Sequence, residues 1–274
     1  MFFGVTAVAG GLFFARRAVL EPGETGDTEI FPGITYRAER IDGPRSPLAH
    51  SVTVDMNHPG VRVTVSEPYT GEGRPFRLAP AEWRLRRGGY AVLLNGARYK
   101  PAGYLNSLPG RAVESVELVV GDGAVAGHRS ISHLIWWDTE GGLHATTERP
   151  APEDAVSAAV HGVGLLSLLI ISGEIDPGAA DPYFADRVIN RTFIGIDPEA
   201  GQLSLFAFAG AREFEAVRYV RDRGVIYGGQ LDSGTSTHLL LGRGAAGLPA
   251  FSGLRGWRPI ASYIAVHSNG PSNP

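Results

Sequence analysis

The stretch Asn190–Gly210, NRTFIGIDPEAGQLSLFAFAG, contains two apolar runs separated by a polar turn. The turn spans Pro198–Gly201, where proline and glycine favour a reversal of the chain. Short apolar runs bounded by turn residues are typical of buried strands. The stretch therefore predicts two strands joined by a turn, and a fold in which strands dominate.

The same kind of pattern recurs along the chain. Val52–Met56 and Val61–Val65 alternate apolar and polar residues on either side of the turn Asn57–Gly60, which predicts an antiparallel hairpin. The count of 37 glycines and 19 prolines also favours many short strands over long helices. Further strands are expected around Tyr90–Asn95, on both sides of Gly121–Gly123, on both sides of Asp138–Gly142, and as one buried strand within Val163–Ile171.

Two segments have helical character. In Ala211–Gly224 the residues Phe214, Val217 and Val220 share one face, acidic residues come early, and Gly224 ends the segment. Pro152–Ala159 gives a weaker helical pattern. We therefore expect an α+β fold, a strand-rich mixed α/β domain with few helices.

Composition excludes several classes of function. The chain has 274 residues, of which 43% are hydrophobic and 19% charged, enough to bury a large core. A formal net charge of −3, with no basic run longer than Arg84–Arg87, predicts no general attraction to nucleic acid or to anionic lipid. Because the chain has no cysteine, disulfides, thiolate metal sites and thiol nucleophiles are excluded.

The first 29 residues differ from the rest in composition. Met1–Ala15 is apolar or small and is followed by Arg16-Arg17, then by a polar linker. This pattern favours an export signal or short anchor, although a first buried strand is the alternative. We therefore expect an N-terminal segment at 1–29, a domain at 30–274, an exported or envelope-anchored protein, and membrane association through residues 1–15.

The stretch Gly228–Leu240, GGQLDSGTSTHLL, contains the best candidate for a reacting side chain. Asp232 follows a predicted strand and precedes a loop of glycine and hydroxyl residues. Loops at strand ends commonly carry ligand sites. Asp-Ser-Gly is also ordinary turn chemistry, so the residue alone leaves both interpretations open.

Four motifs together resemble the phosphodiester glycosidase family, which has many exported bacterial members. They are VLLNGARY from Val92, NRTFIGIDPEAGQLSLFAFAG from Asn190, GQLDSGTSTHLLLG from Gly229, and GWRPIASYIAVHS from Gly256. They occur in the family's order, and the similarity covers Gly33–Ser268. Four ordered motifs are far more specific than one.

The resemblance implies hydrolysis of the bond between a sugar's anomeric carbon and a phosphodiester. Asp232 would then face the sugar as nucleophile, as base for water, or as a support for positive charge. Arg191 would hold the phosphate with its planar fork. Glu114 is a second carboxylate candidate, although a charge on the solvent face of a strand explains it equally well. The expected catalytic residues are Asn95, Glu114, Arg191 and Asp232, and the expected substrate-binding residues are Gly96, Thr192, Gly234, Thr235 and Ser236.

The chain departs from the family pattern at two places. NGARY stands where the family has Asn-Gly-Gly or Asn-Gly-Asp before two aromatics, and Ser233 stands where it usually has glycine. If position 233 required a positive φ, Ser233 would cost of the order of 1 kcal/mol. A catalytically weakened relative that binds glycans or phosphoglycans at the cell envelope is therefore the alternative function.

Other chemistries find less support. GTSTH at Gly234–His238 is not the Gly-x-Ser-x-Gly elbow of many serine hydrolases, which leaves an unrelated hydrolase as the third reading. No His-Glu-x-x-His pattern predicts zinc, and no metal ligand is assigned. The resemblance admits a divalent cation such as calcium, and the expected partner is a sugar phosphodiester or phosphoglycan.

Overall fold

The computed structural model describes residues 25–42, 45–68, 75–100, 107–165, 167–179, 185–245, 248 and 252–269. These residues form a strand-rich fold with three α-helices, and every pairing between named strands is antiparallel. The predicted signal or anchor at residues 1–15 lies outside the described residues. In the part of the chain that is described, no helix is long and apolar enough to cross a membrane.

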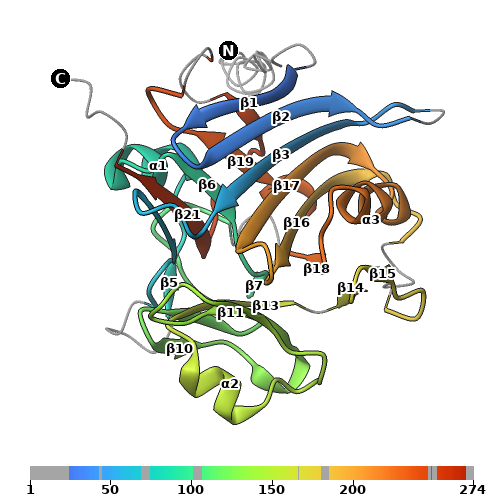
Figure 1. Cartoon of the computed structure of the whole chain (residues 1–274). Coiled ribbons are helices and arrows are strands. Elements are labelled where there is room, and N and C mark those ends of the chain that lie inside the picture. Colours follow the sequence, from blue (N-terminus) through green and yellow to red (C-terminus); the bar gives the residue numbers. More distant parts are fainter. Residues whose placement is uncertain are drawn as a thin grey trace, which may run out of the picture.

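The largest sheet has eight strands in the order β1-β2-β3-β17-β16-β18-β14-β15 (Figure 1). Its centre is the hairpin of β16 (Ile189–Asp197) and β17 (Gln202–Ala211), which confirms the strands predicted around Pro198–Gly201. The other strands are β1 (Thr25–Phe31), β2 (Ile34–Arg40), β3 (Leu48–Asp55), β14 (Leu168–Ile171), β15 (Glu174–Ile175) and β18 (Tyr227–Gln230).

Three smaller sheets complete the fold. The first is β20-β19-β6-β21-β4, with β4 (Val61–Val65), β6 (Val92–Asn95), β19 (His238–Leu241), β20 (Gly253–Arg255) and β21 (Tyr263–Ser268). The second is β10-β9-β13-β11-β12, with β9 (Val119–Gly121), β10 (Ala124–Ala126), β11 (His133–Trp137), β12 (Leu143–Ala145) and β13 (His161–Leu165). The third is β5-β8-β7, with β5 (Phe76–Arg77), β7 (Tyr99–Lys100) and β8 (Ala112–Ser115).

The main core lies where these sheets face one another. It joins Leu205 of the large sheet, Leu94 of the β6 sheet and Val163 of the β13 sheet. The β17 strand is apolar on both faces because Leu205 points into this core while Phe206 and Phe208 pack on the opposite side. This double burial explains the unbroken apolar run that the sequence shows there.

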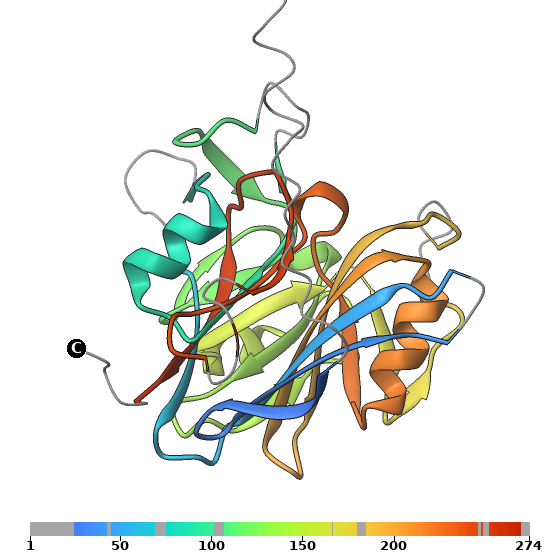
Figure 2. The same cartoon turned by 90° about the horizontal axis from the view of Figure 1, so that it is seen from above.

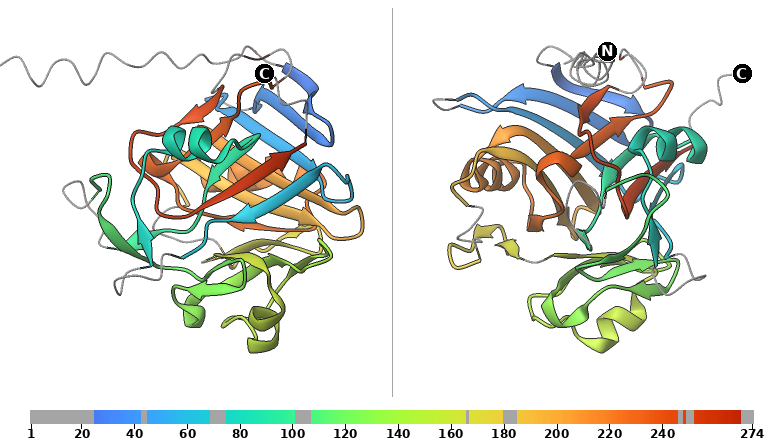
Figure 3. Two further views of the ribbon diagram at one scale, coloured as in Figure 1. Left: turned by 90° about the vertical axis from the view of Figure 1, so that its left-hand side faces the viewer. Right: turned by 180° about the vertical axis from the view of Figure 1, so that it is seen from behind.

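Helices cover the outer faces of the sheets. The predicted helix in Ala211–Gly224 is α3 (Glu213–Asp222), which packs Val217 and Val220 on the large sheet. The weaker prediction is α2 (Glu153–Ala158), at the end of the molecule that carries the β13 sheet (Figure 3). The helix α1 (Ala81–Gly88), which packs Leu85 on the β6 sheet, was not predicted from the sequence. Seen from above, α1 and α3 lie on opposite sides of the molecule (Figure 2).

Two strand predictions were wrong, one about pairing and one about the number of strands. Val52–Met56 and Val61–Val65 do not form a hairpin, because β3 pairs with β2 and β17 whereas β4 pairs with β21 in another sheet. The turn between them leads the chain from one sheet to another, and alternation along a strand does not indicate which strand it pairs with. Val163–Ile171 is likewise divided between β13 and β14, which belong to different sheets.

The start of the fold also differs from the expected boundary. The domain was expected to begin at Ile30, but β1 begins at Thr25 and pairs with β2 from Thr25 onward. Ile30 is 1% exposed and belongs to the main core. The last five residues of the expected linker therefore belong to a strand of the large sheet.

Candidate functional site

Asn95 ties together three segments that are distant in the sequence. It is the last residue of β6 and is 1% exposed. Its Nδ2 donates to the carbonyl of Asp232 at 2.7 Å, and its Oδ1 accepts from Thr192 Oγ1 at 3.0 Å and from the His238 amide at 2.8 Å. The structure therefore brings Asn95, Thr192 and Asp232 together, with Asn95 positioning the loop that carries Asp232.

Gly96 continues this connection through its backbone. Its carbonyl accepts from the Asp232 amide at 3.1 Å, and its own amide donates to the Ser262 carbonyl at 2.9 Å. A Cβ at position 96 would lie 2.6 Å from Ser262 Oγ. The close approach requires glycine here, and Gly96 positions Asp232 through its backbone.

The Asp232 carboxyl lies in an environment that disfavours its charge. Burial raises its pKa to about 6, although the Ser236 hydroxyl and the Arg258 and Arg98 charges act in the opposite direction. The Ser236 hydroxyl is close enough to lower this pKa, yet the two groups do not meet the geometry of a hydrogen bond. A carboxyl with a pKa near 6 is suited to proton transfer close to neutral pH.

Three consecutive side chains after Asp232 have polar atoms with no partner. Ser236, Thr237 and His238 are at most 2% exposed, and within the described residues Ser236 Oγ, Thr237 Oγ1 and His238 Nδ1 form no hydrogen bond. Nearly all buried polar atoms in proteins are hydrogen-bonded. Such a group of unsatisfied atoms beside Asp232 favours a polar ligand or water at this place.

The turn before these residues does not strain Ser233. Its φ is −128°, an extended conformation that any residue adopts, and the left-handed φ of 74° falls on Gly234. Ser233 Oγ accepts from the Thr192 amide at 3.3 Å and donates to the Leu231 carbonyl at 3.2 Å. The strain considered for Ser233 is therefore absent, and its hydroxyl connects the loop to β16.

Arg258 places a guanidinium near Asp232. Its guanidinium donates to Tyr99 OH at 2.7 Å and to Ser107 Oγ at 2.7 Å, and it lies 5.1 Å from the centre of the Tyr99 ring. Among the described residues Arg258 forms no ion pair. The amides of Trp257 and Arg258 donate to the Thr235 carbonyl, which fixes this segment to the Asp232 loop.

Arg98 and Glu117 form the other charged pair near Asp232. Glu117 is 3% exposed and accepts from the Arg98 amide at 2.9 Å and from Arg98 Nε at 2.7 Å. The Glu117 charge raises the pKa of Asp232, while Arg98 lowers it. Glu117 thus forms an ion pair with Arg98, whereas Arg258 forms none among the residues that the structure describes.

The structure does not bring Arg191 to this site, which corrects the expectation that it holds a phosphate. Arg191 is fully buried on the α3 side of β16. Its guanidinium donates to the carbonyls of Ala211 and Arg187 and to Gln230 Oε1, and lies 3.6 Å from Glu213 Oε2. Side chains alternate along a strand, so when Thr192 faces Asn95, its neighbour Arg191 faces away.

Glu114 is also not part of the site. It is exposed on β8, between the buried residues Val113 and Ser115. The carboxylate near Asp232 is instead Glu117, three residues later. Arg98, Tyr99 and Arg258 stand within the quoted motifs but had no predicted role, and Glu117 and Ser107 were not predicted as site residues. Arg98 in VLLNGARY and Arg258 in GWRPIASYIAVHS were the signal in the sequence for a cation at this site.

The remaining expected residues lie in the turn after Asp232. Gly234 and Ser236 bound the short 3-10 turn, and Thr235 lies between them. A Cβ on Gly234 would have no atom within 4 Å, so its left-handed φ, and not crowding, favours glycine. Thr235 contributes its carbonyl to the Arg258 segment, and Ser236 contributes its hydroxyl to the surroundings of Asp232.

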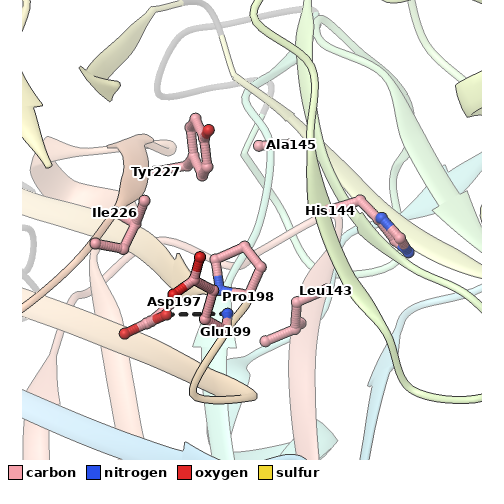
Figure 4. A pocket seen from close by; sticks show the side chains of 8 residues that line it. All are labelled: Leu143, His144, Ala145, Asp197, Pro198, Glu199, Ile226 and Tyr227. Atoms are coloured by element: carbon pink, nitrogen blue, oxygen red, sulfur yellow. Dashed lines mark hydrogen bonds between the residues drawn. The ribbon is translucent and has the colours of Figure 1, made fainter. Parts of the chain in front are cut away.

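A separate hollow of about 450 Å³ lies near the opposite end of β16 (Figure 4). Asp197, Glu199 and Tyr227 are among its lining residues, and the eight residues that line it include neither lysine nor arginine. Such a lining is unsuited to an anionic group. The Asp232 site, with Arg258 beside it, fits an anion better.

The described residues offer no ready place for a divalent cation. No group of three or more histidine, aspartate or glutamate side chains lies close enough to hold a metal ion in the described part of the chain. The carboxylate Glu117 is taken up by Arg98. Among the residues that the structure describes, no group of side chains supports the calcium that the resemblance admits.

Comparison with protein-family models gives no match to this chain, and no curated protein matches its sequence. Solved structures do match. The catalytic domain of zebrafish N-acetylglucosamine-1-phosphodiester α-N-acetylglucosaminidase, described as auto-inhibited by its pro-peptide, has a TM-score of 0.65 and 17% identity. The match covers 90% of this chain and 87% of that domain.

Two bacterial structures are also similar. A hypothetical protein from Synechocystis has a TM-score of 0.64 and 16% identity, over 87% of this chain and 62% of its own. A putative exported protein from Burkholderia pseudomallei has a TM-score of 0.53 and 12% identity, over 85% and 74%. This chain thus spans less than two thirds of the Synechocystis protein. The chain shares its overall fold with the zebrafish catalytic domain, in agreement with the resemblance noted in its sequence.

Proposed function

We propose that this chain is a hydrolase that cleaves the bond between the anomeric carbon of a sugar and a phosphodiester. The observation that supports it best is that Arg258 and Asp232 lie near each other. Arg258 forms no ion pair among the described residues, and burial raises the pKa of Asp232 to about 6. A cation beside an ionisable carboxyl suits a substrate that carries a negative charge next to the bond that breaks.

In this proposal Arg258 holds the phosphate. A guanidinium presents a planar fork of donors that matches phosphate oxygens, and Tyr99 and Ser107 hold this one in place. A phosphodiester leaves as a stable anion, so the leaving oxygen needs charge stabilisation more than a proton. Arg258 takes the phosphate-binding role that was predicted for Arg191.

Asp232 then acts on the other side of the bond. With a pKa of about 6 its carboxyl is mostly ionised at neutral pH, and it takes a proton from water as the water oxygen attacks the anomeric carbon. The bond between that carbon and the phosphate oxygen breaks, and its electron pair stays on the phosphate.

The test uses the full chain and a panel of sugar-1-phosphodiesters, with release of free sugar as the measurement. An aryl glycoside of the same sugar without phosphate is the control. We expect release from the phosphodiester only, and the same rate with a chelator present. Binding that raises the melting temperature without any release would instead favour the glycan-binding alternative. Release from the aryl glycoside at an equal rate would contradict a phosphate-directed site.

The cellular location forms part of the same proposal. The apolar stretch Met1–Ala15 has the composition of an export signal or anchor, and one similar structure is described as a putative exported protein. We place the activity outside the cytoplasm on these grounds. Fractionation of cells that express the full chain tests this placement.

A further inference from the structure

One side of the molecule gathers arginines around an exposed tryptophan, and we call it the arginine–tryptophan patch. Trp83, Arg86 and Arg87 lie on α1, Arg77 lies on β5, and Leu108 and Arg111 lie in the turn before β8. Trp83 is 45% exposed and Leu108 is 59% exposed, and the four arginines are exposed as well.

Hydrogen bonds join the elements of the patch. Arg84 NH2 donates to the Arg77 carbonyl at 2.8 Å, and Arg77 NH1 donates to the Gly110 carbonyl at 3.3 Å. The guanidiniums of Arg84 and Arg87 lie 5.4 Å and 5.0 Å from the centre of the Trp83 ring. The helix, the strand and the turn therefore present one surface.

The inner face of α1 packs on the protein, so its outer face points to solvent. Ala81 and Leu85 are buried against the β6 sheet, so the i+3 and i+4 neighbours Trp83, Arg86 and Arg87 share the outward side. The only acidic residue of α1, Glu82, is occupied in an ion pair with Arg255. The patch therefore gathers four exposed arginines on a chain whose formal net charge is −3.

We propose that the arginine–tryptophan patch docks on a bilayer that contains anionic phospholipid. Arginines attract the negative surface, and Trp83 and Leu108 provide apolar side chains of the kind that insert at the headgroup level. Because the chain as a whole is acidic, the attraction to anionic lipid must come from the arginines gathered in this patch. The proposal does not depend on the hydrolase activity.

The patch lies beside the candidate site. Ala79, two residues after Arg77, forms a β-bridge with Ile260, two residues after Arg258. Arg255, which pairs with Glu82 on α1, lies at the end of β20 just before the same segment. Docking through the patch would therefore hold the candidate site close to the lipid surface.

The experiment measures binding of the full chain to vesicles by sedimentation. Vesicles of phosphatidylcholine with one quarter phosphatidylglycerol are compared with pure phosphatidylcholine, and the quantity that matters is the increase caused by phosphatidylglycerol. Any binding through the apolar residues 1–15 occurs on both vesicles and cancels in this comparison. We expect clear binding at low salt that declines as salt is raised.

Variants at exposed positions test the patch itself. Arg86→Ser with Arg87→Ser should weaken phosphatidylglycerol-dependent binding about thirtyfold, at about fivefold for each arginine near the surface. Trp83→Ala should weaken binding severalfold. The matched control is Phe214→Ala with Arg218→Ser on α3, where an exposed aromatic also contacts an arginine, 5.6 Å from the ring. This control should bind as the unmodified chain does.

Three outcomes would overturn the proposal. The first is equal binding to both kinds of vesicle, and the second is an equal loss in the α3 control. The third is binding of soluble heparin that depends on Arg86 and Arg87 while vesicle binding does not, which would assign the patch to a soluble polyanion. Sugar release by the Arg86→Ser, Arg87→Ser protein is expected to match that of the unmodified chain, so failure of docking and failure of the hydrolase proposal are separable.

Discussion

Replacing Asp232 by asparagine should destroy activity and at the same time stabilise the protein near neutral pH. Asparagine keeps the shape of the side chain but removes the charge, and it cannot accept the proton that the proposed reaction transfers. We therefore expect turnover of a sugar phosphodiester to fall at least about a hundredfold. Folding should respond in the opposite direction, because the folded state disfavours the ionised carboxylate.

The size of the stability gain follows from the pKa of Asp232. Moving from the ordinary value of 3.8 to about 6 corresponds to at most about 3 kcal/mol, at 1.36 kcal/mol for each pKa unit. Since the pKa is raised by folding, the protonated form is the one favoured in the folded state. The free-energy penalty of Asp232 is complete above pH 6, shrinks as the pH falls, and is absent below pH 3.8.

Urea unfolding of the unmodified and Asp232→Asn proteins at pH 7.5 and at pH 4.5 measures this effect. The variant should be more stable at pH 7.5, and the difference should narrow at pH 4.5. Sugar release is measured on the same folded samples. Full activity in the folded variant would refute the catalytic role. A variant that is less stable at both values, and whose activity falls only in proportion to the folded protein, would show that Asp232 only forms a turn.

Three further changes test the neighbouring groups. Arg258→Gln should raise KM for the phosphodiester more than tenfold, and a variant that binds as tightly as the unmodified chain would remove Arg258 from the phosphate site. Ser233→Gly should lower the free energy of unfolding by about 1 kcal/mol without raising activity, since Ser233 is unstrained and its hydroxyl is bonded; a more active variant would contradict this. Burial lowers the pKa of His50 to about 4, so its contribution to stability is present above pH 6.5 and is lost towards pH 4, by at most about 3 kcal/mol. Urea unfolding of His50→Asn against pH should show a weaker decline, and an identical profile would exclude His50 as the cause.

Much of the fold could be predicted because burial in sheets leaves a local pattern. The β16–β17 hairpin and α3 are visible in the order of apolar residues, since each is specified by neighbours in the sequence. The partner of a strand is not specified in that way. Val52–Met56 and Val61–Val65 look like a hairpin in sequence and belong to different sheets in the structure.

α1 was missed for a related reason. Its sequence, AEWRLRRG, buries only Ala81 and Leu85, so its apolar face is too short to give a clear helical period. The helix is stabilised by packing of these two residues on Leu93 and Leu240, which come from two other segments. Tertiary contacts of this kind decide many short helices and cannot be read from a local window.

The candidate site shows the same limit at the level of single residues. The motifs predicted which strands contribute to the site, because Asn95, Thr192 and Asp232 are joined by the hydrogen bonds of Asn95. The prediction for Arg191 placed this side chain on the wrong face of β16. A strand directs Arg191 and Thr192 to opposite faces, and only the packing of α3 shows which face is covered.

The arrangement of charges in the site separates its two arginines by function. Glu117 neutralises Arg98, so that pair holds the surroundings of Asp232 without attracting an anion. Arg258 is held only by the neutral hydroxyls of Tyr99 and Ser107 among its described partners, and a partly buried cation held in this way gains most when a negative group binds beside it. An anion at Arg258 would in turn disfavour a second negative charge on Asp232 and raise the pKa of that carboxyl further. Substrate binding would thereby strengthen Asp232 as a base but lower its ionised fraction, so turnover should increase as the pH is raised through neutrality.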